Sequence, residues 1–117
     1  MKMLANLLVA LVAALHLYFL VLEMFFWTKP LGRKVFRLTP EFAEASKALA
    51  ANQGIYNGFL SAGLLWGLAT GNTANQLFFL SCVVAAGVYG AATVGKKILF
   101  VQALPAALAI AAVLAAR

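Results

Sequence analysis

The sequence predicts an all-α integral membrane protein built as a bundle of four transmembrane helices. Of its 117 residues, 65% are hydrophobic and only 10% are charged, whereas a typical soluble domain is about 45–50% apolar and about 25% charged. A chain of this length buries only about 60–70% of its unfolded surface when it folds. Because so much apolar side chain cannot be hidden from water, we expect its solvent to be lipid.

The same composition argues against several other classes of protein. A single cysteine, Cys82, cannot form an intrachain disulfide, and structural zinc sites need about four ligands. We therefore expect no zinc site. A haem would need a second axial ligand besides the single His16, and His16 and Glu23 alone do not define a metal site, so we expect no metal and no cofactor. The net charge is +6, but the basic residues lie at the ends of apolar runs, as in membrane proteins. We therefore expect no nucleic acid partner.

Four apolar segments are long enough to span a membrane, because a bilayer core about 30 Å thick takes about 20 helical residues. They cover residues 3–27, 50–69, 76–94 and 98–116. The first exceeds the roughly 7–15 apolar residues of a signal peptide, so we expect it to be retained. Together the four spans form one predicted domain over residues 1–117.

The breaks between these segments have identifiable causes. After the first span, Pro30 disfavours a helical conformation at Lys29, and Gly32 adds flexibility. Residues 70–73 form a short turn rich in glycine, asparagine and threonine. Residues 95–97 form a still shorter link, which predicts that the third and fourth spans are antiparallel neighbours.

The connection over residues 28–49 carries a helix start signal in its second half. Thr39 is a hydroxyl N-cap, Pro40 follows at the first helical position, and Glu41 places a negative charge near the positive end of the helix dipole. We expect this helix to continue into the second span without a break. The connection is therefore a basic loop followed by a helical extension.

The distribution of basic residues predicts the orientation of the chain. One side carries seven of the nine basic residues, namely Lys29, Arg33, Lys34, Arg37, Lys47, Lys96 and Lys97, and the other side carries Lys2 and Arg117. The positive-inside bias places the first and third connections in the cytoplasm and both termini outside. This predicts a multi-pass protein of the bacterial inner membrane with periplasmic termini. Arg33, Lys34 and Arg37 either attract anionic lipid headgroups or only set this topology.

Two ionisable residues lie inside the first span. An ionisable residue in a span costs about 2.5–3.5 kcal/mol on insertion scales, and such residues are functional candidates by default. Glu23 is the one acid within any span, and His16 lies two turns earlier on the same face. A carboxyl removed from water can exchange a proton with a cation or a substrate. We predict that Glu23 and His16 carry protons, with a hydrogen-bonded packing role as the alternative for His16.

Polar side chains from the other spans are expected near the level of Glu23, which lies about 9 Å below Lys29 at 1.5 Å per residue. The predicted ligand-binding residues of this cytoplasmic half are Asn52, Gln53, Tyr56, Asn57, Tyr89, Thr93 and Gln102. Such a cluster either holds the helices together through hydrogen bonds, each contributing about 0.6 kcal/mol, or lines a pocket. The carboxyl of Glu23 favours a pocket, because hydrogen bonds between helices do not need a titratable group.

Small residues and one proline bear on how the helices pack. Glycines four residues apart recur at Gly54 and Gly58 and at Gly63 and Gly67. They predict either close packing within the chain or a seam between copies in a homo-oligomer. Pro105 in the fourth span is expected to kink that helix.

Three segments carry a recognisable pattern along almost the whole chain, continuing into Gln102-x2-Pro105. They are His16-x6-Glu23-Met24-x2-Trp27-x2-Pro30-x-Gly32-Arg33-Lys34-Val35-Phe36, Ala51-Asn52-Gln53-Gly54-x-Tyr56-Asn57-Gly58-Phe59 and Ala86-Gly87-x-Tyr89-Gly90-Ala91-Ala92-Thr93. The pattern resembles a bacterial family of short four-span membrane proteins catalogued as domain of unknown function 1304. The resemblance implies an inner-membrane protein with its motif positions on the polar cluster, and it implies no particular activity.

These observations leave three functions open. The first is binding of a small or amphipathic ligand in a pocket open to the cytoplasm, with transport coupled to protonation of Glu23, in a homo-oligomer. In size, span count and its single embedded glutamate the chain looks like the small multidrug-resistance transporters, although it shares no motif with them. The second is an intramembrane enzyme, such as an isomerase of a lipid-soluble substrate, in which Tyr56, Asn57 or Tyr89 polarises an oxygen. The third is a non-catalytic accessory subunit or scaffold.

Overall fold

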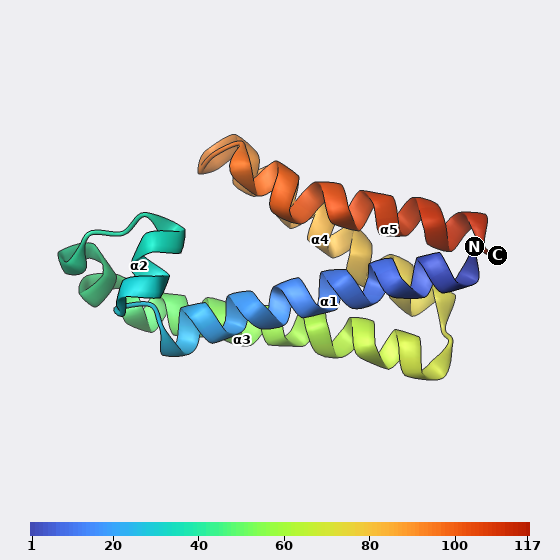
Figure 1. The fold of residues 1–117 in the computed structure, drawn as a ribbon, viewed down its shortest axis with the longest axis horizontal. Helices are drawn as coiled ribbons and strands as arrows, with labels where there is room; N and C mark the ends of the chain where they lie inside the picture. Colours follow the sequence, from blue (N-terminus) through green and yellow to red (C-terminus); the bar gives the residue numbers. More distant parts are fainter. The chain divides into compact units, whose positions relative to one another are not determined.

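The computed structural model describes residues 1–117 and contains helices and no strands (Figure 1). The helices are α1 (Lys2–Phe25), α2 (Pro30–Phe36), α3 (Pro40–Thr70), α4 (Thr73–Thr93), a π-helical turn η1 (Leu99–Ala103) and α5 (Leu104–Ala115). They form two compact units, one of Met1–Ala14 with Leu60–Arg117 and one of Leu15–Phe59. The predicted all-α class is therefore confirmed.

Two of these helices are long and apolar enough to cross a membrane. They are α1, with 24 residues, and α4, with 21 residues, while Leu99–Ala115 forms a shorter apolar helical stretch. Length and composition are the basis of this assignment, and the core helix of a soluble protein or a signal sequence meets the same test. α3 is longer than either, but polar residues interrupt its middle around Asn52–Asn57.

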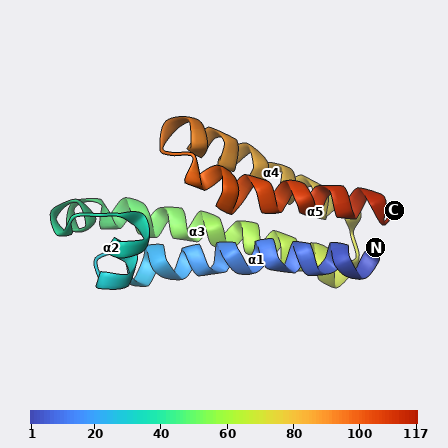
Figure 2. The same cartoon turned by 45° about the horizontal axis from the view of Figure 1, so that its top comes forward.

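The unit that contains both termini has a core of aliphatic and small side chains. Val9 of α1, Leu64 of α3 and Leu80 of α4 are fully buried there, together with Ala106 and Ala109 of α5. Alanines spaced three residues apart present a smooth helix face, so α5 can pack closely against its neighbours. The chain begins and ends at the same end of this unit (Figure 2).

Polar side chains also connect the helices of this unit, at positions that sequence reasoning missed. The Ser61 hydroxyl of α3 donates to the Ala13 carbonyl of α1 at 2.7 Å. The Asn75 amide donates to the Gly63 carbonyl at 2.7 Å, and the Gln76 amide donates to the Gly67 carbonyl at 2.9 Å. Each bond joins a side chain to a backbone oxygen of another helix, which hydropathy patterns do not reveal.

We expect Ser61→Ala to destabilise the packing of α1 on α3 by about 0.6 kcal/mol, and by no more than about 1.7 kcal/mol. The substitution removes a buried interhelical hydrogen bond and leaves the side-chain volume almost unchanged. Reversible unfolding in mixed micelles measures the difference. Ser81→Ala is the matched control, because Ser81 lies exposed on α4. Equal stability of the two variants would contradict the structural role of Ser61.

The π-helical turn η1 lies directly before the proline for which the sequence predicts a kink. The Leu104 N–H donates to the Leu99 carbonyl, five residues back. Pro105 has no N–H, and its ring would clash with the carbonyl four residues before it in a regular helix. The wider π turn accommodates the proline by adding a residue to the turn that precedes it. Gly87 of α4 packs against this turn, and a Cβ at Gly87 would lie only 2.7 Å from the Ala103 nitrogen.

In the unit formed by residues 15–59, the end of α1 and the beginning of α3 lie antiparallel (Figures 1 and 2). Gly58 packs on Leu20 and Gly54 packs on Met24, so the residue numbers run in opposite directions along the contact. α3 begins at Pro40, and the Thr39 hydroxyl accepts the Phe42 N–H at 3.1 Å. This N-cap and the unbroken helix that follows it confirm the pattern read from the sequence.

The short helix α2 lies within the predicted basic loop and was not predicted. The Trp27 indole N–H donates to the Ser46 hydroxyl at 3.0 Å, and the Trp27 and Phe36 rings lie 5.0 Å apart. Gly32 lies against the backbone carbonyl of Phe26. These contacts attach α2 to the ends of α1 and α3 within this unit.

Candidate functional site

The shortest hydrogen bond between α1 and α3 involves the single acid of α1. The Asn57 side-chain amide of α3 donates to Oε1 of Glu23 at 2.5 Å. Both residues are half-buried and belong to the unit formed by residues 15–59. The structure therefore brings together two of the residues that the sequence singles out, one from each of two helices far apart in the chain.

Two glycines of α3 explain why this amide reaches this carboxyl. Gly54 and Gly58 flank Asn57, and each faces α1. A Cβ at Gly54 would lie 3.3 Å from the Leu20 carbonyl oxygen, and one at Gly58 would lie 2.8 Å from the Leu20 side chain. Without side chains at these positions the two backbones approach closely. The short asparagine side chain then spans the gap to Glu23.

The second carboxylate oxygen of Glu23 is open. Asn57 is its hydrogen-bond partner through Oε1, and the ion pair in the chain joins Lys47 to Glu44 instead. The hydrogen bond to Asn57 uses Oε1, and the Glu23 side chain is only half-buried, so Oε2 is the oxygen left available to a proton or a ligand. A carboxyl with one oxygen held and one oxygen open can take up a proton or accept a donor from a ligand.

The other predicted ligand-binding residues of α3 lie in the same unit as Glu23 but are exposed. Asn52 and Gln53 lie about one turn before Asn57, and both are exposed. Tyr56 is 52% exposed, and its ring meets the Phe59 ring edge-on at 5.8 Å. Of these residues only Asn57 forms a hydrogen bond with Glu23, and ligand binding by Asn52, Gln53 and Tyr56 stays a prediction.

Tyr89, Thr93 and Gln102 belong to the other unit, where they lie on α4 and η1. Tyr89 is 72% exposed, and the Thr93 hydroxyl donates to the Tyr89 carbonyl at 2.8 Å within α4. Gln102 is half-buried in the π-helical turn. Their predicted role in ligand binding remains a prediction as well.

His16 is fully buried in α1 and packs edge-on against the Phe19 ring at 5.3 Å. An aromatic contact of this kind is typical of a histidine with a packing role. The proton-carrying role of His16 stays a prediction.

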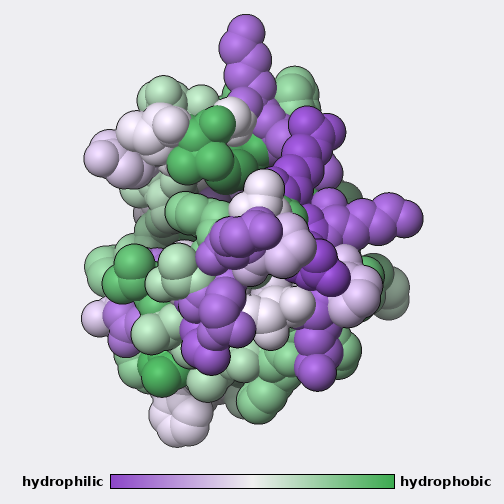
Figure 3. Space-filling model, turned by 90° about the vertical axis from the view of Figure 1, so that its left-hand side faces the viewer, coloured by the Kyte–Doolittle hydropathy of each residue, from purple (hydrophilic) through white to green (hydrophobic).

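Basic side chains gather around α2, and Figure 3 shows hydrophilic side chains projecting among hydrophobic ones on this face. Arg33 and Lys34 lie in the last turn of α2. Arg37 ends the helix in the left-handed conformation, with φ of 56°, and donates its N–H to the Arg33 carbonyl. The left-handed conformation costs a non-glycine residue roughly 1–2 kcal/mol, so the contacts of α2 with α1 and α3 must hold this turn.

The hydrogen bond between Trp27 and Ser46 is the contact in this region that the sequence did not predict. Trp27 stands in the first of the three motif segments, but its hydrogen-bond acceptor lies 19 residues away on α3. A tryptophan at the end of an apolar helix usually needs a partner for its indole N–H. That requirement was the available signal, although it does not identify Ser46.

The comparisons with known proteins agree with the sequence pattern. The family described as protein of unknown function DUF1304 matches residues 10–114, a range that includes Glu23 and Asn57. The chain is 32% identical over 106 residues to the uncharacterized protein YpaA of Lactococcus lactis, which covers 87% of this chain and 89% of that relative. No solved structure matches it significantly. The chain belongs to the DUF1304 family.

Proposed function

We propose that this protein binds a small or amphipathic ligand at Glu23 and couples that binding to movement of a proton across the bacterial inner membrane. The observation that carries the proposal is the half-buried carboxyl with Oε1 held by Asn57 and Oε2 open. A purely structural contact would be satisfied by amides and hydroxyls, as Ser61, Asn75 and Gln76 illustrate elsewhere in the chain.

A four-span topology is part of the proposal. α1, the second part of α3, α4 and the continuous stretch of η1 with α5 would each cross the bilayer, with both termini outside. Many large apolar side chains on these helices are exposed, including Leu7, Trp66, Phe78 and Leu108, and lipid would cover them. The seven basic residues of the first and third connections would face the cytoplasm. There, Arg33, Lys34 and Arg37 would meet anionic lipid headgroups.

The proposed mechanism is competition between a proton and a ligand for the open oxygen of Glu23. The Asn57 amide donates to Oε1 whether the carboxyl is protonated or ionised, because Oε1 keeps an acceptor lone pair in both states. Asn57 therefore holds the carboxyl in one orientation while a proton and a ligand replace one another at Oε2. A ligand with a positive charge or a hydrogen-bond donor beside an apolar body would displace the proton and take its place.

Reconstitution in sealed liposomes with a pH-sensitive dye tests this function. The probes are amphipathic cations, beginning with tetraphenylphosphonium, which has a charge for Glu23 and an apolar body for the surrounding helices. We expect the added probe to release protons in proportion to the amount of protein. Proton movement that no probe alters would contradict the proposal. Chemical conversion of a lipid-soluble substrate without dependence on a gradient would instead support an intramembrane enzyme.

A further inference from the structure

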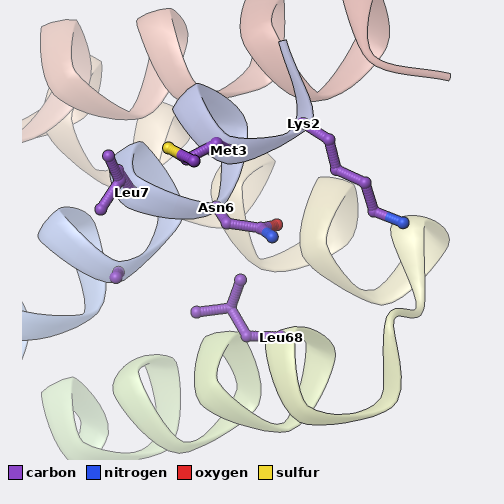
Figure 4. Close-up of a pocket in the computed structure, with 6 residues that line it drawn as sticks. Lys2, Met3, Asn6, Leu7 and Leu68 are labelled. Carbon is purple, nitrogen blue, oxygen red and sulfur yellow. The ribbon is translucent and has the colours of Figure 1, made fainter.

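The unit with both termini carries an open groove between the beginning of α1 and the end of α3. Its volume is about 660 Å³, and Lys2, Met3, Asn6, Leu7, Ala10 and Leu68 line it (Figure 4). Cavities of about 300–1,000 Å³ are typical of small-molecule sites. The groove lies one turn before Ala13, where the Ser61 hydroxyl joins α3 to α1. Beyond that contact the short side chain of Ala10 leaves space between the helices.

The lining of this groove has two chemically different parts. Met3, Leu7, Ala10 and Leu68 form an apolar wall that extends along about 12 Å of α1. Lys2 and Asn6 lie four residues apart on one helix face and form the polar part. In Figure 4 the Asn6 side chain lies between the α1 backbone and Leu68, while the Lys2 side chain extends at one end of the groove.

Neither polar side chain of the groove is used within the protein. Lys2 takes part in no ion pair, and the Asn6 amide has no hydrogen-bond partner in the chain. The three acids of the chain are Glu23, Glu41 and Glu44, and all of them lie in the unit formed by residues 15–59. The helices around the groove therefore offer a positive charge and amide donors and no competing acidic side chain.

We infer that this groove binds one anionic phospholipid. Its phosphate would pair with the Lys2 ammonium and accept a hydrogen bond from the Asn6 amide. Its acyl chain would lie along the wall formed by Met3, Leu7, Ala10 and Leu68. The inference requires only that the protein resides in a bilayer, and it does not depend on ligand exchange at Glu23.

Native mass spectrometry of the full chain, released from nanodiscs of equal phosphatidylglycerol and phosphatidylcholine content, tests the inference. We expect the wild-type protein to retain phosphatidylglycerol in preference to phosphatidylcholine. Lys2→Gln should reduce this preference about fivefold, because a lysine near a membrane surface contributes roughly 1 kcal/mol to the binding of anionic lipid. Ala10→Leu should reduce retention of both lipids, because it fills the space beside the acyl chain.

Two further arms make the result specific to this groove. Lys97→Gln removes a basic residue from the third connection and should leave the Lys2-dependent preference unchanged. Glycerol 3-phosphate, which has the headgroup chemistry without an acyl chain, should not compete with the retained lipid at equal concentration. Equal preference in the wild type and Lys2→Gln, or effective competition by glycerol 3-phosphate, would overturn the inference. Loss of proton movement at Glu23 would leave it standing.

Discussion

Glu23→Gln should lower probe-driven proton movement in proteoliposomes to the level of liposomes without protein. Glutamine has almost the same shape as glutamate, and its side-chain oxygen can still accept the Asn57 amide N–H. It cannot bind or release a proton, however, and it presents no negative charge to a cation. The measurement is the initial rate of the internal pH change after addition of tetraphenylphosphonium.

The controls separate this effect from damage to the fold. Glu41→Gln changes an exposed acid in the first turn of α3, and we expect it to retain the wild-type rate. Glu23→Asp keeps the charge but shortens the side chain, so it should lose much of the contact with Asn57 and keep part of the activity. The helical circular dichroism of all three variants should equal that of the wild type. A Glu23→Gln protein that works at more than half the wild-type rate would exclude proton exchange at this residue.

Gly32→Ala should detach α2 from the ends of α1 and α3. An added Cβ would overlap the carbonyl oxygen and carbon of Phe26. These are backbone atoms, so no change of side-chain rotamer can relieve the overlap. Overpacking of this kind typically costs about 1–3 kcal/mol. We expect a loss of stability in this range, together with a change in Trp27 fluorescence as its contacts with Phe36 and Ser46 are lost. Denaturation in mixed micelles and tryptophan emission measure the two effects.

Gly95→Ala is the matched control for this prediction. A Cβ at Gly95 would meet nothing within 4 Å, so the same chemical change adds no clash there. Trp66 contributes to the fluorescence as well, so the comparison is made in a Trp66→Phe background, which leaves Trp27 as the one tryptophan. Equal stability and equal emission of the two alanine variants would show that α2 is not held by the contact at Gly32.

The sequence predicts the helical class and the start of α3 because both depend on local or bulk properties. Apolar composition is a property of the whole chain, and the Thr39 cap needs only the next three residues. The helix α2 depends on tertiary contacts instead. It has seven residues, including a proline and a glycine, and so has little intrinsic helix propensity. Trp27 and Ser46 support it from outside, and no local pattern indicates their pairing.

The pair of Glu23 and Asn57 was predictable only in part. Helical spacing places Gln53, Tyr56 and Asn57 on neighbouring parts of one face of α3, and it does not decide which of them meets α1. The structure selects Asn57 because glycines lie on either side of it at the closest approach of the helices. The glycine spacing was visible in the sequence, but the partner helix was not.

The most direct test of the account is to observe protonation of Glu23 itself. In a Glu41→Gln and Glu44→Gln background Glu23 is the one side-chain carboxyl of the chain, and loss of the exposed Lys47–Glu44 pair should cost less than about 1 kcal/mol. Infrared difference spectroscopy with isotope-labelled glutamate then reports the carboxyl band of this residue. We predict that addition of tetraphenylphosphonium removes the band of the protonated acid and produces that of the carboxylate. A Glu23 carboxyl whose spectrum is identical with and without the probe would contradict the account.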